Sequence, residues 1–232
     1  METLVVKNVS RSYYDPEGNL FTALNQVNLT WKKAESIAVM GESGSGKSTL
    51  ARLLIGLEKP TSGEILIDGQ NAARWSKRQW LRCRTDLQAV FQDERGTLSP
   101  RRSVSQNAEE ALCNLTGMRK SERMDCILSL MEQLAMSRNL LDVPVRQLSG
   151  GEQRRIGLLR ALAVKPKFLI LDEVTAGLDL LSAEAVLALL QKYQTLYECS
   201  YLLITHDMNA ATRLCSRLFE LDHGRVIHEA VQ

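Results

Sequence analysis

The chain has 232 residues, of which 44% are hydrophobic and 24% are charged, and its formal net charge at neutral pH is +2. This length suits one α/β domain with a sizeable core. Acidic and basic residues are interspersed, and no apolar run approaches the roughly 20 residues that cross a bilayer, so we expect a soluble intracellular protein that binds no nucleic acid. The five cysteines are scattered and lack C-x-x-C spacing, which favours reduced thiols over disulfides or a metal site.

The first segments predict an antiparallel sheet at the edge of the domain. Residues 4–9 and 23–31 have β-type patterns, and the turn-rich stretch 15–19 separates them. Tyr13 and Tyr14 stand just before this turn. An aromatic ring at this place could stack on a purine, although a tyrosine pair in a loop is more often simply packed.

The stretch 41–49 reads Gly-Glu-Ser-Gly-Ser-Gly-Lys-Ser-Thr and lies between an apolar run and a helix-like run. This strand, loop and helix setting is the one that the phosphate-binding pattern G-x-x-x-x-G-K-[ST] requires. Its glycines let phosphate approach backbone N–H groups, Lys47 reaches the β- and γ-phosphates, and the Ser48 hydroxyl faces Mg²⁺ at the start of the helix. The sequence therefore predicts a nucleoside triphosphate site made of Gly41, Ser43, Gly44, Ser45, Gly46, Lys47, Ser48 and Thr49.

The middle of the chain is predicted to be helical. Ser103 and Gln106 have capping-box spacing, and apolar residues between positions 124 and 135 recur at helical intervals. We interpret 94–147 as a helical subdomain inserted in a nucleotide-binding core. The single domain 1–232 then has a core made of 1–93 and 148–232.

The stretch 148–153 reads Leu-Ser-Gly-Gly-Glu-Gln and runs into a helical pattern. Ser149 and Glu152 again have capping-box spacing, so Gly150 and Gly151 fall in the first turn of this helix. Glycines at that place let a ligand approach the N–H groups of the helix start, but they also suit an ordinary flexible helix start. From the residues alone, both interpretations stay open.

Four buried strands are predicted to end in polar groups. In chain order they end at the phosphate loop, at Gln92, at Asp172 with Glu173, and at His206. Ligands of an open parallel sheet bind beyond the carboxyl ends of its strands, so these groups are expected to converge. Asp172 suits Mg²⁺ beside Ser48, and Glu173 suits polarisation of the attacking water. Gln92 could supply an oxygen to Mg²⁺ or position the water, and His206 could contact the γ-phosphate.

Two further elements are expected in the last third of the chain. Apolar residues recur at helical spacing from Val186 to Tyr197, which predicts a helix with one buried face. Residues 218–221 and 226–227 flank a turn and predict a closing β-hairpin.

In their order, these motifs resemble the motif set of the ATP-binding-cassette (ABC) ATPases over nearly the whole chain. The stretch Leu-Ser-Gly-Gly at 148–151, between the two nucleotide motifs, is the specific part of the resemblance. The resemblance implies an α/β fold: a P-loop NTPase (RecA-like) core with an antiparallel β subdomain and an inserted α-helical subdomain. The implied cofactors are ATP and Mg²⁺.

The same resemblance implies a head-to-tail dimer of two such subunits. Each ATP would lie between the phosphate loop of one chain and the helix end of the other, with Tyr13, or failing that Tyr14, stacked on adenine. Glu173 would be the general base and His206 the γ-phosphate switch. The residues implied to contact ATP or the partner across the dimer are Ser149, Gly150, Gly151, Glu152 and Asp179.

A finer resemblance concerns the group of dipeptide, oligopeptide and nickel importers, and especially its nickel-type members. The resemblance to the group rests on Val-Phe-Gln-Asp at 90–93 followed by Leu-Ser-Pro-Arg at 98–101, and the resemblance to the nickel-type members rests on the stretches 41–52 and 160–167. It implies a cargo of nickel, another metal chelate or a small peptide, and a peripheral location at the cytoplasmic face of the inner membrane. The implied partners are a second ABC ATPase, related but not identical, two membrane permeases and an extracytoplasmic solute-binding protein.

The sequence departs from the group's pattern at two places. Glu94 follows Asp93 and Val174 follows Glu173, where the group usually has proline, and neither change removes a catalytic group. Two alternatives are an exporter-type ABC ATPase and a non-transport ABC ATPase of DNA repair or translation. The segment 92–102 argues against the first, and the absence of tandem cassettes, coiled-coil insertions and zinc cysteines from this sequence argues against the second.

Overall fold

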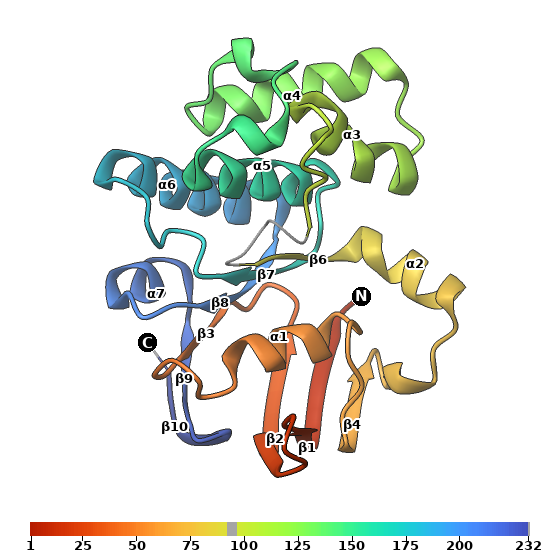
Figure 1. Ribbon diagram of the computed structural model, residues 1–232, viewed down its shortest axis with the longest axis vertical. Helices are drawn as coiled ribbons and strands as arrows, with labels where there is room; N and C mark the ends of the chain where they lie inside the picture. The colour runs from red at the N-terminus through yellow and green to blue at the C-terminus, as the bar shows by residue number, and fades with distance from the viewer. Residues whose placement is uncertain (92–96, 232) are drawn as a thin grey trace.

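The computed structural model describes residues 1–91 and 97–231, and these residues form two β-sheets and a group of helices (Figure 1). The strands of the larger sheet are β3 (Ile37–Met40), β6 (Leu87–Val90), β7 (Phe168–Asp172), β8 (Ser200–Ile204), β9 (Arg217–Asp222) and β10 (Arg225–Val231). Their order is β10-β9-β3-β8-β7-β6. All neighbours are parallel except β10 and β9, which form the predicted closing hairpin.

The smaller sheet is antiparallel and confirms the β segments predicted near the start of the chain. Its strands, in the order β2-β1-β4-β5, are β1 (Thr3–Tyr14), β2 (Leu20–Lys32), β4 (Ser62–Ile67) and β5 (Gln70–Asn71). β1 and β2 are longer than predicted because irregularities in their pairing absorb extra residues without ending the strands. Asn8 and Gln26 accordingly have positive φ angles of 48° and 52°.

The helices are distributed over both sides of the larger sheet (Figure 1). They are α1 (Lys47–Leu54), α2 (Lys77–Asp86), α3 (Val104–Leu115), α4 (Lys120–Gln133), α5 (Gly150–Ala163), α6 (Leu180–Tyr197) and α7 (Met208–Leu214). Short 3₁₀ turns occur at Ala72–Arg74, Arg138–Leu140 and Val145–Gln147. In the part of the chain that the structure describes, no helix combines the length and the apolar character needed to cross a bilayer.

The two faces of the larger sheet pack against different layers because side chains alternate along each strand. In β7, Phe168 and Ile170 face the layer that contains α1 and the smaller sheet, whereas Leu169 and Leu171 face the helices that include α3, α5 and α6. Trp31 of β2 packs edge-on against Phe168 with 4.8 Å between the ring centroids. The apolar face of α1, the helix that follows the phosphate loop, is therefore buried in the same cluster as residues of both sheets.

Local capping signals located the starts of α3 and α5 correctly. The capping boxes of Ser103 with Gln106 and of Ser149 with Glu152 are both present, at α3 and α5. Helix α2 was not predicted, although Ser76 and the residue three positions later form a third such box. The prediction that Tyr197 lies on the buried face of α6 is wrong, because this residue ends the helix and is 42% exposed.

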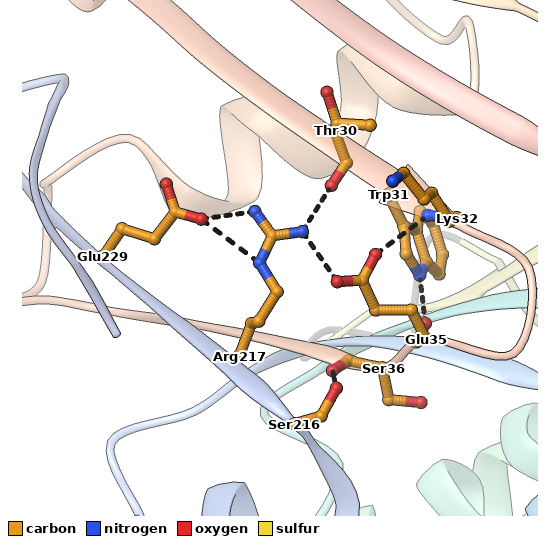
Figure 2. Close-up of polar contacts among 8 residues, drawn as sticks. All are labelled: Thr30, Trp31, Lys32, Glu35, Ser36, Ser216, Arg217 and Glu229. Atoms are coloured by element: carbon orange, nitrogen blue, oxygen red, sulfur yellow. Dashed lines mark hydrogen bonds and ion pairs between the residues drawn. The ribbon is translucent and has the colours of Figure 1, made fainter. Parts of the chain in front are cut away.

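A network centred on Arg217 of β9 joins the two sheets (Figure 2). The guanidinium donates to Glu35 Oε1 over 2.7 Å and to the carbonyl of Thr30 over 3.2 Å. On its other side it donates to Glu229 of β10, with Nε 3.2 Å from Oε1. Only 20% of the Arg217 and Glu35 side chains is exposed, so this ion pair is well shielded from solvent. The antiparallel layer is thereby tied to the edge of the parallel sheet.

We expect Arg217→Ala to lower the free energy of unfolding by about 2 to 3 kcal/mol, because it leaves the mostly buried Glu35 carboxylate without its cation. Urea unfolding followed by circular dichroism measures this change. The matched control is Arg213→Ala, which breaks a pair with Glu184, whose side chain is 56% exposed, and should cost less than about 1 kcal/mol. Equal losses for the two variants would contradict a structural role for the network.

Candidate nucleotide-binding and catalytic site

The predicted phosphate loop connects β3 to α1 and depends on glycine at two positions. Gly41 and Gly46 have positive φ angles of 143° and 106°. A Cβ on Gly41 would lie 2.0 Å from the carbonyl oxygen of Leu221, and one on Gly46 would lie 2.4 Å from that of Ala23. Any larger residue would therefore displace the loop from the backbone on which it rests.

Lys47 lies at the mouth of this loop, at the first position of α1. Its Nζ donates to the carbonyls of Gly41 over 2.7 Å and of Glu42 over 2.6 Å, and lies 3.3 Å from Ser45 Oγ. Burial lowers the pKa of Lys47, and the nearby carboxylate of Glu173 opposes this shift. The ammonium group is thus fixed where the loop would meet the phosphates of a nucleotide.

Asp172 ends β7 and is 2% exposed. Burial raises the pKa of Asp172, whereas a hydrogen bond with Ser48 lowers it. Within the described ranges, its Oδ1 has no hydrogen-bond partner. A buried carboxylate oxygen without a donor, next to a serine hydroxyl, is the oxygen-rich environment that Mg²⁺ prefers. These two residues therefore fit the predicted metal ion.

Glu173 follows Asp172 directly but faces a different neighbour. Its φ of 54° bends the chain at the end of β7, and its N–H donates to the carbonyl of Ile204 over 2.9 Å. His206 Nδ1 lies 3.1 Å from Oε1 and 3.0 Å from Oε2 of Glu173. The Glu173 side chain is 15% exposed and that of His206 is 74% exposed, so the pair reaches from the interior to the surface. Gln92, the other predicted catalytic residue, lies outside the described residues.

A single cavity of about 580 Å³ brings most of the predicted site residues together. This volume is within the usual range for small-molecule sites. The predicted residues on its lining are Gly41, Ser43, Gly44, Gly46, Lys47, Ser48, Thr49, Asp172, Glu173 and His206. Ser45 is buried beneath the loop instead, where its carbonyl accepts a hydrogen bond from the N–H of Gly224 over 3.0 Å.

Phe21 also lines the cavity, although nothing in the sequence predicted this position. Tyr13 pairs with Phe21 in the register of β1 and β2, but the Tyr13 hydroxyl donates to Glu58 over 2.5 Å. The guanidinium of Arg11 lies 4.4 Å from the centroid of the Tyr13 ring. Tyr14 is 77% exposed and is also absent from the lining. The stacking role of Tyr13 stays a prediction, and it requires the ring to leave these contacts.

The glycine-bearing helix end does not line this cavity. Ser149 caps α5 by accepting the N–H of Glu152 over 3.3 Å, and the Glu152 carboxylate accepts the N–H of Ser149 over 2.9 Å. Hydrogen bonds from Ser149 lower the pKa of Glu152. Gly150 and Gly151 lie in the first turn, as predicted. Within this chain, the helix end is therefore separate from the cavity that holds the phosphate loop.

Asp179 occupies an exposed position at the start of α6. Its Oδ1 accepts the N–H of Ser182 over 2.9 Å, and hydrogen bonds at Ser182 lower the pKa of Asp179. Leu180 and Leu181 beside it are 84% and 83% exposed. An exposed carboxylate next to two exposed leucines suits a contact with another subunit.

The sequence profile of the ABC transporter family matches residues 24–176 of this chain. The chain belongs to this family. Its catalytic activity is the hydrolysis of ATP, and its α/β architecture is that of the ABC ATPases, which confirms the predicted fold class.

Curated relatives are similar over most of the chain. The nickel import ATP-binding protein NikE of Shigella boydii is 41% identical over 204 residues, which cover 88% of this chain and 76% of that protein. The protein of the same name in Escherichia coli K12 is 40% identical over 208 residues, covering 90% of this chain and 78% of that protein.

Solved structures agree with the architecture. The ATP-binding cassette MJ0796, in a dimeric post-hydrolysis state with ADP and Pi, superposes with a TM-score of 0.89 at 31% identity, covering 98% of each chain. The protein cbiO1 of Clostridium perfringens, part of the ABC transporter complex cbiONQ, has a TM-score of 0.78 at 30% identity, covering 100% of this chain and 89% of that one.

We expect Glu173→Gln to retain ATP affinity within about twofold and to lower kcat by at least about 100-fold, because the amide keeps the shape of the carboxylate but cannot accept a proton. Steady-state hydrolysis and equilibrium binding of ATP measure the two quantities. The control is Lys47→Ala, which should weaken ATP binding itself because it removes the ammonium from the loop. Wild-type turnover by the Glu173 variant would refute the assignment of the base.

Proposed function

We propose that this chain is the ATP-hydrolysing subunit of an importer for nickel. The observation that carries the proposal is the combination of the cavity formed by the phosphate loop, Asp172, Glu173 and His206 with 40–41% identity to nickel import ATP-binding proteins over most of the chain. The other cargoes that fit this proposal are another metal chelate and a small peptide. The cargo itself would bind to other subunits.

The proposed assembly contains a second, related ABC ATPase, two membrane permeases and an extracytoplasmic solute-binding protein, at the cytoplasmic face of the inner membrane. The exposed start of α5 supports the pairing of two ATPases, because its glycines lie away from the cavity of their own chain. In the head-to-tail arrangement, Ser149, Gly150, Gly151 and Glu152 of one chain contact the ATP on the other, and Asp179 crosses the same interface.

The predicted site residues have separate parts in the proposed hydrolysis. Lys47 and the N–H groups of the loop bind the β- and γ-phosphates. Ser48, Asp172 and the predicted Gln92 would hold Mg²⁺, which would supply positive charge beside the phosphates. Glu173 takes the proton of the attacking water as general base. His206 orients the Glu173 carboxylate through the contact at 3.0 Å and senses the γ-phosphate.

The test is purification of the affinity-tagged chain in mild detergent, followed by identification of its partners and measurement of ATP hydrolysis in proteoliposomes. We expect two permeases, a second ATPase and a solute-binding protein, and we expect hydrolysis to rise at least about fivefold when that protein is loaded with Ni²⁺ or a nickel chelate. Glu173→Gln in the same assembly is the control for turnover.

Two results would contradict the proposal. Stimulation by dipeptides and not by nickel would move the cargo to peptides. Recovery with ribosomes, with DNA-repair factors or with a permease of exporter type would exclude import altogether.

A further inference from the structure

Two arginines on α5 bind the segment that follows the catalytic strand β7. Arg155 Nη1 donates to Ser182 Oγ, at the start of α6, over 2.8 Å. The guanidinium of Arg154 donates to the carbonyl of Ala176. Both arginines lie in the second turn of α5, one turn after the glycines that are proposed to contact ATP on the partner. The helix end and the segment 173–182 are therefore joined by direct hydrogen bonds.

This segment reaches into the nucleotide cavity at its first residues. Glu173 and Ala176 both line the cavity. The N–H of Ala176 donates to the carbonyl of Glu173 over 3.1 Å, and that of Leu178 donates to the carbonyl of Thr175 over 3.2 Å. Hydrogen-bonded turns thus run from Glu173 to Leu178, and the Asp179 carboxylate then accepts the N–H of Ser182 at the start of α6, so a chain of short contacts links the cavity lining to Ser182.

Close packing reinforces the hydrogen bonds. A Cβ on Gly151 would lie 3.0 Å from Leu178 Cδ2, so the start of α5 and the segment are almost in contact at this point. Leu178 also packs against the large hydrophobic cluster beneath the helices. Packed interiors transmit small shifts because they contain little free volume.

Loss of the hydrogen bond between Arg155 and Ser182 would be energetically costly. Its Nε is buried and has no hydrogen-bond partner within the described ranges. Removal of the Ser182 hydroxyl would deprive Nη1 of its acceptor as well, and an unpaired buried donor is costly. The guanidinium is thus held in one orientation mainly by Ser182.

We propose that Arg155 and Ser182 form a latch that couples the two ATP sites of the dimer. The inference rests on the proposed head-to-tail arrangement. When the start of α5 engages ATP on the partner, the latch sets the position of the segment 173–182, and with it the position of Glu173 on the ATP of its own chain. Arg155 is a positioning residue that acts through this segment, and the coupling between the sites is a free energy that the latch transmits.

The first test uses the full chain alone and hydrogen–deuterium exchange. We expect Arg155→Gln and Ser182→Ala each to raise amide exchange at 174–183 at least about threefold, while Ser182→Thr, which keeps the hydroxyl, leaves it unchanged. Arg213→Ala is the matched control. Arg213 also donates to a residue of α6, Glu184, over 2.7 Å, but Glu184 lies outside the segment 173–182. Unchanged exchange in both latch variants would overturn the proposal.

The second test uses the purified assembly and the ATP dependence of hydrolysis. Arg155→Gln and Ser182→Ala should each lower kcat about tenfold with KM within twofold, reduce the Hill coefficient toward 1, and have no larger effect when combined. A merely structural contact would lower stability without changing the Hill coefficient. A wild-type Hill coefficient of 1, or additive losses in the double variant, would overturn the latch.

These outcomes are separate from a failure of the importer proposal. The exchange measurement needs neither nucleotide nor permease, and the hydrolysis measurement does not depend on which cargo is carried. A transporter of peptides with an intact latch, and a nickel importer without one, would give different results in the two experiments.

Discussion

The parallel pairing of β3, β8, β7 and β6 is the constraint on which the site depends. Because these strands point in one direction, the phosphate loop, His206 and the Asp172-Glu173 pair meet at one edge although they are far apart in the sequence. The register is fixed by apolar side chains buried on both faces of the sheet. A shift of β7 by one residue would exchange its two faces and remove Asp172 from Ser48.

The site holds two ions in surroundings that disfavour their charge. Burial raises the pKa of Asp172 and lowers that of Lys47, and the Oδ1 of Asp172 has no hydrogen-bond partner in the part of the chain that the structure describes. Both groups would gain from a ligand of opposite charge: the carboxylate from a divalent cation and the ammonium from a phosphate. Relief of this unfavourable burial would therefore contribute to the free energy of binding a magnesium nucleotide.

The parts of the site that the sequence predicted are those set by local patterns. The phosphate loop and the caps at Ser103 and Ser149 need only a few neighbouring residues, and the strand ends follow from short apolar runs. The parts it did not predict depend on tertiary structure. The place of Phe21 in the cavity follows from the pairing of β1 with β2, and the bonds of Arg155 and Arg217 join segments distant in sequence. Neither the place of Phe21 nor these hydrogen bonds can be predicted from a short stretch of sequence.

Gly150, at the start of α5, has no structural role among the described residues of its own chain. A Cβ on Gly150 would meet no described atom within 4 Å, and no positive φ requires glycine there. Glycine in a helix costs about 1 kcal/mol relative to alanine, so packing within this chain gives no reason for it. Close approach of a ligand held by another molecule does give a reason. In the proposed head-to-tail dimer, the site in one chain would be half of a composite site, and hydrolysis should then depend on how often the two halves meet.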